Sequence, residues 1–358
     1  MLRDSNYRQV FADLLRDTVI PAFDNDASKR RSYQRLNGYI KGNMPKSLFR
    51  YRSTASYNIE ALRRGNIPVT KPSEMGDIFD SQIVVDIERV VTELMEMLNN
   101  IDVAANHIFE GKPFPDFAMK GVSRKMRRVV QKNKGYATGN LALKPQMRLQ
   151  AASTIAELKK RAESEYGATT DVLRHTGYIA CFCEDVNGVT MWDRYADRHR
   201  GYALEYEFER LNARFHFLEV SDKSIQPDYV VLPVIYGETY NSSLIIIHSL
   251  FNQYVQEIGG KGAYINHPDE LWSIKGYLYK AADYKSEAEW RLITPLKGVP
   301  RNSKSFVNVD AVPIAIYYGA NMPDNMRHEL ETIAVANGLT RYRMEINPLD
   351  MGVKAVLL

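Results

Sequence analysis

Short segments in which apolar and polar residues alternate recur along this chain of 358 residues, and such alternation is the pattern of half-buried β-strands. The alternation is strictest in residues 201–208 (GYALEYEF), where every second side chain is apolar or aromatic. Further strands are expected at residues 47–52, 66–70, 177–182, 229–237, 287–293, 314–319, 341–346 and 353–357. Because helical patterns lie between many of them, the chain predicts an α+β fold.

Apolar residues at three- and four-residue spacing predict helices in the intervals between the strands. The first 40 residues read as helical with a break at Pro21, and a helical pattern runs from Ser81 to about Gly167, where glycine is expected to end it. The chain therefore divides into an N-terminal helical segment and an α+β core that a helical insertion interrupts. These three parts are residues 1–46, residues 47–80 with 171–358, and residues 81–170.

The composition is that of an ordinary globular protein, with 45% hydrophobic and 25% charged residues. Its two cysteines, Cys181 and Cys183, give no sign of an oxidising compartment. The first residues are charged and lack the apolar core of a signal peptide, and no stretch has the length and apolarity of a membrane span. We therefore expect a cytoplasmic protein.

The positive charge of the chain is concentrated in residues 120–134 (KGVSRKMRRVVQKNK), which contain seven Lys or Arg and no acid. A basic patch of this kind can bind the phosphates of a nucleic acid, and Lys125, Arg127 and Arg128 are the candidate contacts. The alternative is a solvated helix face or loop. The pattern alone leaves both open.

The strongest candidate for chemistry is residues 280–293 (KAADYKSEAEWRLI). If this segment is extended, Glu287, Glu289 and Arg291 project from one face, because side chains alternate along a strand. Trp290 would then anchor the other face in the core. Unpaired charge on a buried face is costly, so such a face indicates a site, whereas a solvent-facing edge would carry ordinary Glu–Arg pairs.

Two other segments supply candidate binding residues. Arg50 and Arg52 share a face of the strand at 47–52, and a guanidinium suits phosphate or carboxylate; the alternative is that they pair with acids such as Asp77 or Asp80. In a helical turn near residue 192, an aromatic face made of Met191, Trp192 and Tyr195 could stack a ligand ring or pack in the core.

Several familiar site patterns are absent from the sequence. The GGKG at residues 259–262 lacks the spacing of a phosphate loop, no Gly-x-Ser-x-Gly elbow occurs, and the seven histidines include no pair at metal-ligand spacing. The sequence therefore predicts no metal site of the usual kind and no serine or zinc hydrolase.

Taken in order, three segments resemble a large prokaryotic family catalogued as domain of unknown function 2971. They read LFRYRS…NIEALRRGNIPVTKPSEMGDIFD, CFCEDVNGVTMWDRYADRHRGYALEYEF and KAADYKSEAEWRLI, and the resemblance spans roughly residues 47–347. The family tends to have Phe, Asn and Pro in the first segment's turn, where this chain has Met75, Gly76 and Ile78. The family name implies no activity.

The order of these motifs also resembles that of ADP-ribosyltransferases. That resemblance implies a mixed, mostly antiparallel split sheet in which an early strand carries the arginine that holds NAD, and a late strand carries Glu-x-Glu. Cys183 stands where a serine is usual in the middle strand. On this reading, NAD is the substrate and the catalytic residues are Glu289 and Glu287. The cofactor-binding residues are then Arg52, Arg50, Cys183, Trp192, Tyr195 and Arg291.

The resemblance implies a toxin or phage-defence effector that modifies a nucleic acid or a protein, with an antitoxin or regulatory partner. Arg52 and Glu289 should then lie on neighbouring central strands and face one cleft, with Trp192 or Tyr195 at its rim. Glu289→Gln should remove most of the catalysis and hardly change stability.

Two readings of other classes remain open. In a nucleic-acid-binding or metal-dependent nuclease-like protein, Asp77, Asp80, Glu287 and Glu289 would hold a divalent cation. A non-enzymatic interaction module is the other reading. Magnesium dependence without NAD dependence would favour the first, and function retained after Glu289→Gln would favour the second.

Overall fold

The computed structural model describes residues 6–20, 26–76, 80–96, 155–207, 229–257, 269–294, 306–349 and 351–358. Within these ranges most strands belong to one ten-stranded sheet, with β12-β11-β10-β4-β1-β3-β2-β9 as its main order. β8 pairs with the other edge of β3, and β5 pairs with β8. Every pair in this sheet is antiparallel except that of β10 with β11. The expected α+β class with a mostly antiparallel sheet is confirmed.

The strands are short, as the alternating segments of the sequence indicated. In the large sheet they are β1 (Ser47–Arg52), β2 (Asn66–Thr70), β3 (Tyr178–Cys183), β4 (Tyr202–Glu207), β5 (Val230–Pro233), β8 (Glu289–Thr294), β9 (Phe306–Asp310), β10 (Ala315–Tyr318), β11 (Thr340–Asn347) and β12 (Gly352–Leu357). A separate parallel pair is formed by β6 (Ile235–Tyr236) and β7 (Tyr279–Lys280).

The sheet opens at its centre. β3 pairs with β1 at Phe49 and Cys183, and with β2 at Thr70 and Ile179, so both strands use the same edge of β3 but at its opposite ends. Between these two points β1 and β2 separate, and the middle of that edge has no paired strand in the described ranges. This opening positions the candidate site.

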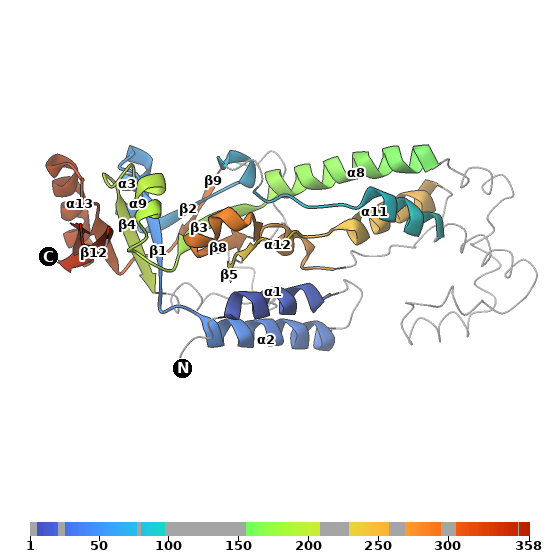
Figure 1. The fold of residues 1–358 in the computed structure, drawn as a ribbon, viewed down its shortest axis with the longest axis horizontal. Coiled ribbons are helices and arrows are strands. Elements are labelled where there is room, and N and C mark those ends of the chain that lie inside the picture. The colour runs from blue at the N-terminus through green and yellow to red at the C-terminus, as the bar shows by residue number, and fades with distance from the viewer. Residues whose placement is uncertain are drawn as a thin grey trace, which may run out of the picture.

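Helices cover the sheet and extend beyond it. They are α1 (Tyr7–Asp17), α2 (Asp26–Asn43), α3 (Ser56–Arg63), α8 (Ile155–Thr176), α9 (Val189–Tyr195), α11 (Ser243–Glu257), α12 (Trp272–Gly276) and α13 (Asp324–Ala336), with the 3-10 turns η1 (Pro72–Glu74) and η3 (Ala282–Glu287). Figure 1 shows α1 and α2 side by side along the molecule, and α8 and α11 running away from the sheet at the end opposite α13 and β12.

The core has three parts. The largest joins α1, α2, α3, α12 and α13 to the sheet, where residues such as Phe182, Trp290 and Leu48 are buried. A second part lies around Trp192 and includes Tyr51 and Cys183. A third fills the space between α8, α11 and the helical residues 87–96, apart from the sheet. Of the predicted helical insertion, residues 87–96 and 155–170 are helical, whereas residues 81–86 are not and include a β-bridge from Val84 to Asn241. Residues 97–154 lie outside the described ranges.

The predicted end of the insertion's last helix was wrong. α8 continues through Gly167 to Thr176. A glycine inside a helix costs only about 1 kcal/mol relative to alanine. The helix is held on both sides of that position by buried side chains such as Leu158 and Leu173, which outweigh this cost.

Within the described residues, no helix has the length and apolarity needed to cross a membrane.

Candidate functional site

A cleft of about 560 Å³ lies where β1 and β2 separate, a volume within the usual range for small-molecule sites. Its wall comes from β1, α3, β2, β3, α9, β7, η3 and the start of β8. It combines aromatic rings with charged groups from both ends of the chain. Its lining residues include Phe49, Arg50, Arg52, Tyr57, Asp80, Cys181, Cys183, Arg194, Tyr195, Lys280, Tyr284, Glu287 and Glu289.

Two carboxylates in this wall meet on one lysine. The Nζ of Lys280 donates to Glu287 Oε2 at 2.7 Å and to Glu289 Oε2 at 2.8 Å, and both glutamates are only 3% exposed. Burial opposes the charge on Lys280, but the two carboxylates outweigh it and raise the pKa of Lys280 above its usual value. Lys280 therefore stays charged and holds the two carboxylates together.

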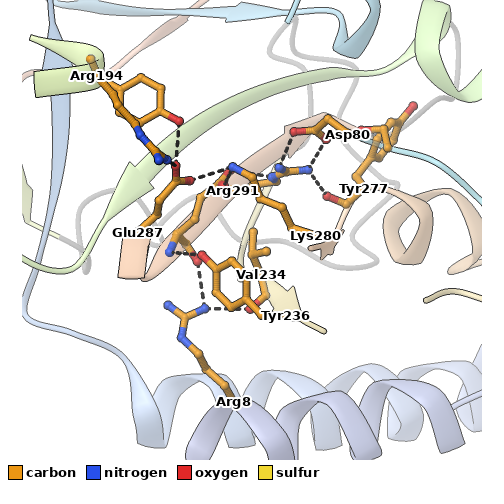
Figure 2. Close-up of polar contacts among 12 residues, drawn as sticks. Arg8, Asp80, Arg194, Val234, Tyr236, Tyr277, Lys280, Glu287 and Arg291 are labelled. Atoms are coloured by element: carbon orange, nitrogen blue, oxygen red, sulfur yellow. Dashed lines mark hydrogen bonds and ion pairs between the residues drawn. The ribbon is translucent and has the colours of Figure 1, made fainter. Parts of the chain in front are cut away.

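Arg291 binds Glu289 from the protein interior. Its Nε donates to Glu289 Oε1 at 2.6 Å, and its Nη atoms form a fork to Asp80 at 2.7 and 2.6 Å. Figure 2 shows the fork of hydrogen bonds between Arg291 and Asp80. Burial alone would raise the pKa of Glu289, but Arg291 and Lys280 lower it to about 2. Glu289 is therefore ionised, with a charged donor on each oxygen.

Arg291 itself is 0% exposed and does not line the cleft. Asp80 and Glu289 keep its pKa above the usual value despite its burial. The expectation that Arg291 contacts a cofactor is therefore wrong: its donors are used by Asp80, Glu289 and the carbonyl of Tyr277 at 2.6 Å. It supports the carboxylates instead.

Glu287 is held less tightly. Its Oε1 accepts from the hydroxyl of Tyr195 at 2.8 Å and lies 3.5 Å from Nη1 of Arg194, whose side chain is 52% exposed. Burial and the charge of Glu287 raise the pKa of Tyr195, so the phenol keeps its proton. Glu287 Oε1 is thus the oxygen of the carboxylate pair that a ligand could reach by displacing the phenol of Tyr195 and the 3.5 Å ion pair with the exposed Arg194.

The backbone between the two glutamates is turned, not extended. Glu287 ends η3, Ala288 adopts a left-handed conformation with φ 43° and ψ 45°, and β8 begins at Glu289. The expected strand over residues 287–293 therefore began two residues too early, and β8 continues one residue further, to Thr294. The two carboxylates still converge, because both reach Lys280, and Trp290 is buried on the opposite face as predicted.

Arg52 brings a positive charge to the same cleft. It ends β1 and is half-buried, and its guanidinium makes no ion pair with any residue that the structure describes. Burial lowers the pKa of Arg52, although the neighbouring Tyr202 and Tyr206 oppose that effect. An arginine in this state is suited to an anionic ligand.

Arg50 has a structural contact. It is 7% exposed, its Nη2 donates to the carbonyl of Pro68 at 2.6 Å, and its guanidinium lies 5.7 Å from the ring centre of Phe182. It thereby bridges β1 to β2 at the opening of the sheet. The suggested pairing with Asp80 does not occur, because Asp80 binds Arg291. Asp77 lies outside the described residues.

The predicted relation of Arg52 to Glu289 holds in part. Both line one cleft, as expected. Their strands are not neighbours, because β3 lies between β1 and β8. Phe49, Cys183 and Glu289 are paired in one row across these strands, so their side chains leave the sheet on the same face. Because side chains alternate along a strand, the side chain of Arg52 leaves β1 on the opposite face. The open edge of β3 is what lets residues of both faces line the same cleft.

Trp192 belongs to the core. It is 0% exposed, its indole N–H donates to the carbonyl of Val186 at 2.7 Å, and its ring packs edge-on against Tyr51 with centroids 5.0 Å apart. The core-packing alternative is therefore the right one, and the proposed stacking of Trp192 on a ligand is wrong. Tyr195, one helical turn further, does line the cleft and is 42% exposed.

Both cysteines line the cleft. Cys183 is 2% exposed and its thiol donates to the carbonyl of Asp185 at 3.1 Å, so the thiol proton is already used within the protein and not directed to a cofactor. Burial, together with the nearby negative charge of Glu289, raises the pKa of the Cys181 thiol. Both thiols are therefore neutral parts of the wall.

Lys280, the residue that joins the carboxylates, was not predicted from the sequence. Its signal was present, since it opens the segment KAADYKSEAEWRLI, but nothing in the spacing said that it would fold back onto both glutamates. Tyr284 was missed as well; its ring centre lies 4.5 Å from Lys280 Nζ. The proposed nucleic-acid contacts Lys125, Arg127 and Arg128 lie outside the described residues.

The carboxylates do not form a metal centre in this arrangement. Asp80, Glu287 and Glu289 face Arg291 and Lys280. Throughout the described ranges, no three His, Cys, Asp or Glu residues are placed to hold a metal ion.

The fold and the site define an α+β protein with a charged, aromatic cleft. A family model described as "Protein of unknown function (DUF2971)" matches residues 191–292. The matched region runs from α9 to β8 and includes Tyr195, Lys280, Glu287 and Glu289. No curated protein and no solved structure matches the chain.

Proposed function

We propose that the protein binds NAD in this cleft, cleaves its nicotinamide–ribose bond and transfers ADP-ribose to an acceptor. The observation that carries the proposal is the placement of an arginine without an ion pair among the described residues, Arg52, in one cleft with the paired carboxylates of Glu287 and Glu289. A dinucleotide needs both kinds of group, because its pyrophosphate is anionic and its ribose offers hydroxyl donors.

In this proposal Arg52 binds the pyrophosphate, and the rings of Tyr57, Tyr195 and Tyr284 border the nicotinamide and adenine. Breaking the bond between the ribose carbon and the nicotinamide nitrogen leaves the electron pair on nicotinamide. The sugar then becomes oxocarbenium-like. A fixed carboxylate nearby stabilises that charge. The acceptor forms the new bond to the same carbon and loses its proton to a base.

The roles of the two glutamates differ from those expected from the sequence. Glu289 is bound by Arg291 and Lys280 on separate oxygens, whereas Glu287 Oε1 faces Tyr195. We therefore assign the contact with the sugar to Glu287, and we assign to Glu289 the task of holding Lys280 in place.

Nicotinamide release from NAD tests the proposal, with four variants beside the wild type. Glu287→Gln should slow release by about 100-fold, since one preorganised electrostatic contact is lost. Arg52→Met should weaken NAD binding roughly 10-fold or more, the value of a charged hydrogen bond. The matched controls are Glu345→Gln and Arg64→Met, whose side chains form ion pairs with Arg343 and Glu60 away from the cleft.

Wild-type protein that neither binds nor cleaves NAD would refute the proposal, as would Glu287→Gln cleaving at the wild-type rate. Labelled NAD incubated with the protein and cell extract then shows whether the acceptor is a nucleic acid or a protein.

A further inference from the structure

The backbone of Glu289 is held from a distant part of the chain. Nη1 of Arg8, on helix α1, donates to the carbonyl oxygen of Glu289 at 2.9 Å and to that of Val234 at 2.8 Å. Figure 2 shows Arg8 reaching from its helix to this point, on the side of the strand away from Arg194 and Glu287. Arg8 is absent from the cleft wall, so it would act without touching a ligand.

A second contact fixes the guanidinium itself. Nη2 of Arg8 forms an ion pair with Glu184 at 2.6 Å, and both side chains are largely buried, with 20% and 18% exposed. The same oxygen of Glu184 accepts from the indole N–H of Trp290 at 2.6 Å and from the hydroxyl of Tyr7. Glu184 therefore ties α1 to the end of β3 and to β8.

The amide of Glu289 is fixed as well. It donates to the hydroxyl of Tyr236 at 2.7 Å, while the Glu289 carbonyl also accepts from the amide of Val234 at 3.0 Å. Both backbone polar groups of the residue are thus committed. This matters because Glu289 directly follows the left-handed Ala288, the point where the chain turns between the two carboxylates.

We propose that Arg8 is a positioning residue for the carboxylate pair. By fixing the Glu289 carbonyl it holds the turn at Ala288, and with it the meeting of Glu287 and Glu289 on Lys280. The catalytic consequence rests on the proposed function, but the positioning of the backbone does not. Helix α1 is on this view part of the site's support, although Arg8 and Glu289 are 281 positions apart.

Amide hydrogen exchange tests the positioning directly. Arg8→Met should speed exchange at Glu289 and Trp290 by about 10-fold or more, since local opening becomes easier, and leave β11 unchanged. Arg8→Lys should restore part of the protection, because an ammonium reaches one carbonyl but not a fork of acceptors. The control is Arg16→Met, on the same helix, where the exposed guanidinium pairs with Asp13 and Glu238.

The same variants separate positioning from binding. Arg8→Met should lower the kcat for NAD cleavage by about 10-fold or more, as expected for a displaced group, and leave the affinity for NAD within about 2-fold. Unchanged exchange at residues 287–290, or an equal rise throughout the sheet, would overturn the positioning role. If the wild type does not act on NAD, the proposed function fails while the exchange result still decides the role of Arg8.

Discussion

Glu289→Gln removes a charge from the centre of the buried network and is the sharpest test of how that network works. From the sequence alone, the substitution was expected to leave stability nearly unchanged, on the view that a catalytic carboxylate in a cleft contributes little to folding. The contacts predict otherwise, because Glu289 is 3% exposed and each of its oxygens binds a charged donor, Arg291 or Lys280.

The size of the effect follows from the pKa of Glu289, which is lowered from 4.5 to about 2. At about 1.4 kcal/mol for each unit, the folded protein favours the ionised carboxylate by roughly 3 kcal/mol. Removing one partner of a buried ion pair typically costs about 3–5 kcal/mol, which agrees in order of magnitude. We therefore expect Glu289→Gln to lower the free energy of unfolding by about 3 kcal/mol at neutral pH.

The pH dependence checks the cause. Because the pKa of Glu289 is lower in the folded state, its stabilisation is fully present above pH 4.5 and is lost as the pH falls towards about 2. The difference between wild type and Glu289→Gln should accordingly shrink through that interval. Urea unfolding followed by circular dichroism, at a series of pH values from neutral downward, measures it.

The matched control is Glu345→Gln on β11, where the carboxylate is 34% exposed and pairs with Arg343. An exposed pair of this kind contributes about 0–1 kcal/mol, so its loss should hardly shift the urea midpoint. The reasoning would be refuted if Glu289→Gln were as stable as the wild type at neutral pH. A difference that stays constant as the pH falls would also refute it.

Two backbone substitutions test the geometry of the cleft, both by urea unfolding. Ala288→Gly should stabilise the protein by roughly 0.5–1 kcal/mol, because the relief of left-handed strain exceeds the cost of the larger entropy of the unfolded chain. The control is Ala281→Gly, at an extended position, which should instead destabilise the protein. Gly201→Ala should cost about 1–3 kcal/mol, since its Cβ would lie 2.1 Å from the carbonyl oxygen of Arg52. An unchanged midpoint in Ala288→Gly, or a neutral Gly201→Ala, would contradict these expectations.

The parts of the fold that could be predicted from the sequence are those that depend on local periodicity. The strands at residues 47–52 and 66–70 have the predicted bounds, because their alternating side chains each meet a buried face. The helix that passes Gly167 shows the limit of this reasoning. Gly167 is a local signal for helix termination, but the buried side chains on both sides of it stabilise a continuous helix.

The site was predictable in its residues but not in its geometry. Glu287 and Glu289 were singled out by the cost of burying charge, and both are buried. Their convergence depends on Lys280 and on a left-handed alanine, and no spacing rule predicts left-handed backbone at a residue other than glycine or asparagine. Trp192 failed as a ligand contact because a helical aromatic face gives no information about which side the core will occupy.

The distribution of charge in the cleft divides structural from functional groups. Asp80, Glu287 and Glu289 meet two buried cations, Lys280 and Arg291, so the rear wall carries one negative charge more than its buried partners balance. That excess falls at Glu287, whose further contacts are a phenol and the exposed guanidinium of Arg194 at 3.5 Å. A ligand with a developing positive charge would find its strongest attraction there, while its anionic part would be drawn to Arg52 across the opening of the sheet. Specificity should therefore depend on Glu287 and Arg52, and the groups that hold Glu289 should govern how precisely the two are aligned.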